Sequence, residues 1–119
     1  MTREAWVLGG ASNRFGKMKE TGREAASRVA LEAIQVAGLE PKDIGYTFVS
    51  NAFGVAERQA HIGPLINTAL GIPEVPSHTI ESACSSSSAA LHDAYVPWPG
   101  ASSMPPWSSA SKSSLTSIP

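Results

Sequence analysis

The residue whose type and surroundings best suit covalent chemistry is the single cysteine, Cys84. It stands in the run Glu81-Ser-Ala-Cys-Ser-Ser-Ser-Ser-Ala-Ala-Leu91, in which most neighbours are small. A strand-forming segment precedes this run and a helix-forming segment follows, so we expect a tight turn that presents Cys84 at a helix N-terminus. Free N–H groups and the helix dipole would stabilise a thiolate there. Such a thiolate is suited to accepting an acyl group from a thioester, because one thioester replaces another of similar energy.

A second interpretation of Cys84 stays open at this point. A lone cysteine among small residues is more often a small buried hydrophobic residue than a nucleophile. One cysteine also excludes an internal disulfide framework and a cysteine-based zinc site.

The sequence lacks the residue spacing of common nucleotide-binding and metal-binding motifs. The interval from Gly10 to Gly16 is one residue too long for a phosphate-binding P-loop, and the Gly-x-Gly-x-x-Gly pattern of dinucleotide-binding proteins is absent. The histidines have no metal-ligand spacing, and we interpret each as a surface or loop residue: His61, His78 and His92.

The size and charge of the chain exclude several classes of protein. Its 119 residues support at most one modest domain, and a net charge of −1 gives no electrostatic reason to expect nucleic acid or anionic membrane as partner. The N-terminus does not resemble a secretory signal, and no segment reaches the ~20 apolar residues of a membrane span. We therefore expect a soluble cytoplasmic protein.

The composition changes sharply after Tyr95. Residues 96–119 contain eight serines, five of the nine prolines and one charged residue, Lys112. The prolines prevent a long helix or a central strand, and the Ser/Pro composition predicts a disordered tail. We therefore divide the chain into a folded body, residues 1–95, and a tail, residues 96–119.

Within the body, apolar runs and turn residues alternate in the order strand, helix, strand, helix, strand, helix. This order predicts βαβ units, a mostly parallel sheet and an α/β fold. The expected elements are a buried strand at 5–8, a helix after Thr21 that ends near Gly38, a strand at 46–50, a helix at 61–70, a strand around 78–80 and a helix within 84–95.

Local signals mark the ends and faces of the helices. Thr21 and Glu24 have the spacing of a capping box, and Gly38 suits a left-handed residue after the helix. In the second helix, Pro64 must lie in the first turn. We expect the last helix to pack through Ala89, Ala90 and Leu91.

The segment from Ile80 to Leu91 resembles the nucleophile segment of thiolases, the acetyl-CoA acetyltransferase family. Glu81 is a departure, since many members carry Asn, Ser or Thr there. The resemblance covers about residues 3–95 and points to the archaeal-type and sterol-carrier-protein-type branch. Its other segments are Arg14-Phe15-Gly16-Lys17, residues 33–44, and Gln59-Ala60-His61-Ile62-Gly63.

The resemblance implies an incomplete N-terminal half of a thiolase fold, a fold in which two related α/β halves pack as five layers and usually dimerise. Cys84 would carry the acyl thioester while acyl-CoA and acetyl-CoA condense to 3-ketoacyl-CoA, or during the reverse reaction in lipid metabolism. Acyl-CoA and CoA would be substrates, with no tightly bound cofactor or metal. The family's activating histidine, second base and main CoA-binding segments have no counterpart here, so we expect this chain alone to be inactive.

Two hypotheses follow from the body of the chain. One is a fragment of a thiolase-like acyltransferase. The other is a small non-catalytic α/β module that binds an acyl ligand or a partner. Acyl transfer by a full-length version, against ligand binding without turnover, separates them.

The genetic code offers an explanation of the tail. If its codons are read one nucleotide earlier, Trp98 followed by Pro99 forces alanine, and Trp107 followed by a TCN serine codon forces valine. Ordinary choices elsewhere give a helix end, a polar turn and an apolar run typical of a buried parallel strand. We hypothesise that residues 96–119 are an out-of-frame product and that the chain is truncated after Tyr95, which resequencing the gene around that codon would test.

Overall fold

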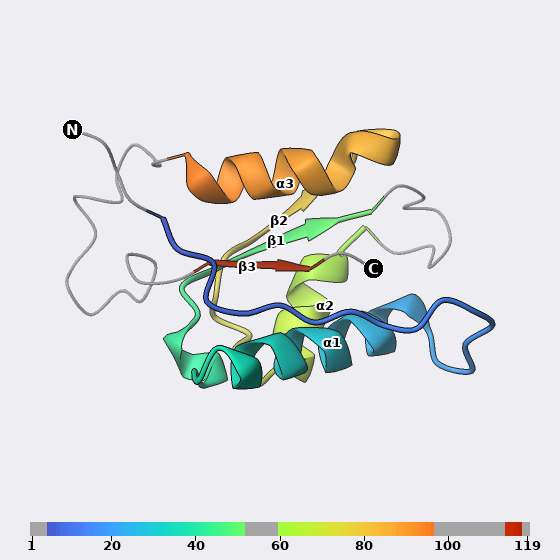
Figure 1. Cartoon of the computed structure of the whole chain (residues 1–119), viewed down its shortest axis with the longest axis horizontal. Helices are drawn as coiled ribbons and strands as arrows, with labels where there is room; N and C mark the ends of the chain where they lie inside the picture. Colours follow the sequence, from blue (N-terminus) through green and yellow to red (C-terminus); the bar gives the residue numbers. More distant parts are fainter. Residues whose placement is uncertain (1–4, 52–59, 97–113, 118–119) are drawn as a thin grey trace.

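The structure, a computed structural model, describes residues 5–51, 60–96 and 114–117. Three parallel strands form one sheet in the order β2-β1-β3. Helix α3 lies over one face of the sheet, and α1 and α2 lie on the other (Figure 1). The predicted α/β class with a parallel sheet is therefore confirmed. In chain order, the elements are α1 (Gly22–Val36), a 3-10 turn (Pro41–Asp43), β1 (Tyr46–Ser50), α2 (Ile62–Ala69), β2 (Ser77–Ile80), a second 3-10 turn (Ala83–Ser85), α3 (Ser86–Tyr95) and β3 (Ser114–Ser117).

Helix α1 begins and ends where its sequence predicts. The Thr21 hydroxyl accepts a hydrogen bond from the Glu24 N–H at 3.2 Å, and the Glu24 carboxylate accepts one from the Thr21 N–H at 2.8 Å. At the other end Gly38 has φ 71°, and its N–H donates to the Gln35 carbonyl. The next N–H, from Leu39, donates to the Ile34 carbonyl, which completes a Schellman motif. The predicted capping box and C-terminal glycine are both confirmed.

The core lies between the sheet and the two helices α1 and α2. β1 is the central strand, and Thr47, Phe48, Val49 and Ser50 are all buried. Burial of every consecutive residue is expected for a parallel strand covered on both faces. The apolar core cluster consists of Ala26, Ala30, Ile34, Ile44, Val49, Ile62, Ile66, Leu70 and Ile72.

The strand predicted at residues 5–8 is wrong. This segment is extended chain without strand pairing, and its apolar side chains face solvent, with Trp6 78% and Val7 89% exposed. The reason is that β2 pairs with one edge of β1 and β3 with the other, so neither edge of β1 is open to it. Just after the segment, Gly9 lies so close to the end of α1 that a Cβ there would come within 2.9 Å of the Ala37 nitrogen.

The tail forms one element that its composition does not predict. Residues 114–117 form β3, a short edge strand parallel to β1. Val96 caps α3. The rest of the predicted disordered tail lies outside the described residues, as do residues 52–59, which precede α2.

The helices that flank β2 follow their predictions with one correction, which concerns Leu91. α2 begins at Ile62, so Pro64 lies in its first turn as expected. Its buried face includes Asn67, whereas Ala69 is exposed. In α3, Ala90 is completely buried but Leu91 is 60% exposed. Ala90 is the residue turned most directly towards the sheet, and Leu91 lies about 100° further around the helix, on the side open to solvent.

In the part of the chain that the structure describes, no helix combines the length and the apolar character needed to cross a membrane.

Candidate functional site

The connection between β2 and α3 is a strained turn around Cys84. β2 ends at Ile80, and residues 83–85 make a single 3-10 turn before α3 begins at Ser86. Ala83 has φ 48°, the one positive φ of a non-glycine residue in the described ranges. Such a conformation costs roughly 1–2 kcal/mol for a residue with a Cβ. The predicted strand, turn and helix are thus present, and the turn is held in a form that the backbone does not favour by itself.

Cys84 lies in the middle of this turn, two residues before α3. Its thiol is free and exposed. The interpretation of Cys84 as a small buried hydrophobic residue is therefore wrong. An exposed thiol on a turn next to a helix start is accessible to a reagent or to a substrate.

The start of α3 is electrostatically suited to an anion. The N-cap residue, Ser85, makes no side-chain capping bond, and the first turn carries no acidic residue. The first N–H groups of a helix have no partner within the helix, and they carry its partial positive charge. A thiolate or a developing oxyanion near this end would therefore be stabilised.

Hydrogen bonds from neighbouring serines hold the turn on both sides of Cys84. The Ser85 hydroxyl donates to the Ser82 carbonyl at 2.7 Å. The Ser86 hydroxyl accepts from the Ser82 N–H at 2.7 Å and donates to the Ala83 carbonyl, also at 2.7 Å. Sequence reasoning treated these serines only as small residues. One signal was available, because Ser86 lies four residues before the buried Ala90 and so shares its helix face.

The histidines lie on three separate elements and are all exposed, as predicted. His61 caps α2, His78 lies in β2, and His92 lies in the last turn of α3, 3.5 Å from the Asp93 carboxylate. Across the described ranges, no group of three or more His, Cys, Asp or Glu side chains is arranged to hold a metal ion.

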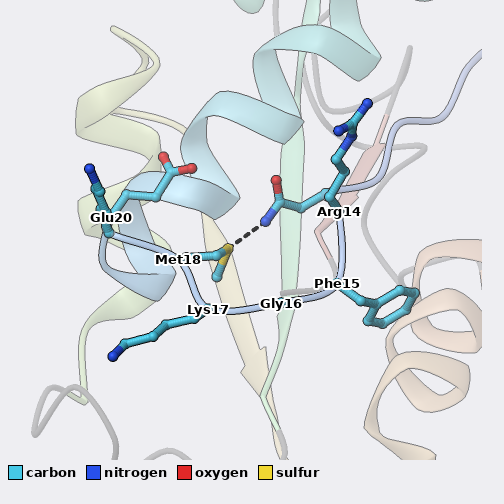
Figure 2. A pocket seen from close by; sticks show the side chains of 8 residues that line it. Arg14, Phe15, Gly16, Lys17, Met18 and Glu20 are labelled. Carbon is cyan, nitrogen blue, oxygen red and sulfur yellow. Dashed lines mark hydrogen bonds between the residues drawn. The ribbon is translucent and has the colours of Figure 1, made fainter.

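A shallow hollow of about 290 Å³ lies in the loop before α1 (Figure 2). Residues 13–20 line it, including the Arg14-Phe15-Gly16-Lys17 segment, whereas Cys84 does not. Arg28 on α1 holds both ends of the loop, since its guanidinium donates to the Asn13 side chain at 2.8 Å and to Glu20 at 2.6 Å. Across the hollow, the Asn13 amide bonds to the Met18 sulfur (Figure 2). The hydrogen bond to Glu20, and then the charge of that carboxylate, raise the pKa of Arg28 further above its ordinary value.

The comparisons with known proteins point to one kind of enzyme. No family model matches the chain. It is 33% identical over 96 residues to an acetyl-CoA acetyltransferase of Methanocaldococcus jannaschii, a match that covers 79% of this chain and 24% of that protein. It is also 33% identical over 91 residues to an acetyl-CoA acetyltransferase of Methanothermobacter thermautotrophicus, covering 75% of this chain and 24% of that protein. The chain thus spans about a quarter of the length of these curated relatives.

Proposed function

We propose that this chain is part of a thiolase-like acyltransferase and that Cys84 accepts the acyl group. The observation that carries the proposal is the exposed, free thiol of Cys84 on the turn between β2 and α3. Its support from similarity is the 33% identity to two archaeal proteins named acetyl-CoA acetyltransferase.

The proposed first step is a thioester exchange. The Cys84 sulfur, as thiolate, attacks the carbonyl carbon of acyl-CoA. The new carbon–sulfur bond forms as the bond to the CoA sulfur breaks, and CoA leaves as a thiolate that takes up a proton. Donors at the start of α3 would stabilise the oxyanion of the tetrahedral intermediate.

Complete turnover needs more than this step. The condensation half-reaction requires a base that removes a proton from acetyl-CoA. The exposed histidines on α2, β2 and α3 are not assigned that role, since none of them corresponds to a catalytic histidine of thiolases. We therefore propose that the 119-residue chain does not turn over by itself, and that dimerisation and CoA binding belong to the complete protein.

The test is acylation of a complete protein that carries this N-terminal region. After incubation with acetyl-CoA, intact-mass spectrometry should show one acetyl adduct that hydroxylamine removes. Cys84→Ala should abolish the adduct. Cys84→Ser should also abolish it, because a serine hydroxyl ionises far less readily than a thiol at neutral pH.

Ser88→Ala is the matched control, since Ser88 is an exposed member of the same serine run. An adduct that persists in Cys84→Ala would exclude Cys84 as the acceptor. Binding of acetyl-CoA without any adduct would favour the non-catalytic α/β module instead.

A further inference from the structure

Ser86 is the one serine of the run 85–88 whose side chain is buried. It is 3% exposed, and it begins α3 on the face that carries the completely buried Ala90. Its hydroxyl both accepts and donates at 2.7 Å, from the Ser82 N–H and to the Ala83 carbonyl. These two backbone groups belong to the residues immediately before Cys84.

The backbone to which the Ser86 hydroxyl bonds includes Ala83, the strained residue of the turn. Ala83 has φ 48°, a conformation that residues with a Cβ rarely adopt without support. The Ser86 hydroxyl bonds to the Ser82 N–H, which precedes Ala83, and to the carbonyl of Ala83 itself. The φ and ψ bonds of Ala83 lie between these two contacts, so the contacts restrict both angles. Because Ser86 and Ala90 are packed against the sheet, this hydroxyl is a fixed point to which the turn is attached.

We propose that Ser86 is a positioning residue: its buried hydroxyl fixes the Ser82–Ala83 backbone and so sets where the Cys84 thiol stands relative to the start of α3. The proposal rests on the proposed function, because the position of the thiol matters only if Cys84 reacts. The hydrogen bonds of Ser86 do not themselves depend on acyl transfer. Ser85 and Ser88 are exposed and cannot anchor the turn to the sheet in this way.

Alkylation of Cys84 by iodoacetamide tests the proposal in the full 119-residue chain. Cys84 is the single cysteine, so all of the label reports on it. The variants are Ser86→Ala, Ser86→Thr, which keeps a hydroxyl, and Ser88→Ala as the matched control. Rates are measured at neutral pH, well below the melting temperature of each variant, and again in urea, where all variants should react equally.

Ser86→Ala should slow native alkylation by about 3- to 10-fold, the range expected when hydrogen bonds that hold a reactive group are lost. Ser88→Ala should react at the rate of the unsubstituted chain, and Ser86→Thr should lie closer to that rate than Ser86→Ala. A lower melting temperature for Ser86→Ala with an unchanged native rate would overturn the proposal, because a purely structural role predicts that result.

Two further measurements cover the cases in which Ser86→Ala does not fold or the proposed function is wrong. If Ser86→Ala does not fold, the double variant Ala83→Gly/Ser86→Ala replaces it, since glycine adopts φ 48° without support. The reference for the double variant is the Ala83→Gly chain with Ser86 intact. Glycine adopts many other conformations besides φ 48°, so loss of the Ser86 hydroxyl should still slow alkylation relative to this reference. Equal rates in the two chains would contradict the proposal. Failure of the proposed function appears separately, as absence of the acetyl adduct on Cys84 in the complete protein.

Discussion

Asn67 is completely buried, and its side-chain amide joins three parts of the chain. Its oxygen accepts a hydrogen bond from the Thr47 hydroxyl of β1 at 3.0 Å, and its nitrogen donates to the Val75 carbonyl before β2 at 2.7 Å. Because a buried polar group is costly unless it is paired, these bonds specify how α2 packs against the β1–β2 pair.

Asn67→Ala should lower the free energy of unfolding by about 2–3 kcal/mol. The substitution leaves the buried Thr47 hydroxyl without this acceptor and the partly buried Val75 carbonyl without this donor. Thr68→Ala is the control on the same helix, because the Thr68 side chain is exposed and its hydroxyl bonds back to the Pro64 carbonyl of that helix. Urea denaturation measures both. Equal losses for the two variants would contradict a special role for Asn67.

At the scale of elements, prediction succeeds where the signal is local. The ends of α1 are set by Thr21, Glu24 and Gly38 within one turn of each end, so they can be identified from the sequence. The prediction of a strand at 5–8 is wrong because apolar β-forming residues show only that a segment is able to pair. Whether it pairs depends on an open strand edge, and both edges of β1 are already paired. The position of Cys84 follows from neighbouring elements, but the anchoring by Ser86 depends on which face α3 buries.

The capping box of α1 predicts an acid sensitivity. Hydrogen bonds from the Thr21 N–H, and then from its hydroxyl, lower the pKa of Glu24 below its usual 4.5. A carboxyl whose pKa is lower in the folded chain stabilises the fold above its unfolded pKa, and that contribution is lost as the pH falls through the folded value.

Glu24→Gln should therefore lose less stability than the unsubstituted chain when the pH is lowered from neutral to below about 4.5, as followed by thermal melts across that range. Glu32→Gln removes an exposed carboxyl from the same helix and is the matched control. If both variants show the same pH dependence, the capping box does not carry the effect.

At the scale of the whole molecule, large apolar side chains remain in solvent over several elements. They occur on the N-terminal segment, on the loop before α1 and on the outer face of α3, and they include Trp6, Val7, Leu8, Phe15, Leu91 and Tyr95. Exposed apolar surface of this kind promotes association.

We expect the isolated 119-residue chain to self-associate or aggregate as its concentration rises. Sedimentation velocity over a range of concentrations measures this, and Val7→Lys combined with Leu91→Lys should shift the distribution towards monomer. Glu32→Lys adds a positive charge at an exposed polar position and serves as the control. A monodisperse monomer that melts in one sharp, cooperative transition would contradict the expectation.

The pairing of β3 with β1 has a consequence for the order of folding. Thr47 pairs with Ser77 on one side and with Leu115 on the other, so the second contact spans more than twice as much chain as the first. Each doubling of a loop adds only ~0.6 kcal/mol of closure entropy, which is a small thermodynamic penalty. The kinetic effect is larger, because contacts between distant segments form late. During synthesis, the helices and the β1–β2 pair can therefore assemble before β3 exists, and one edge of β1 then stays open until residues 114–117 have been made.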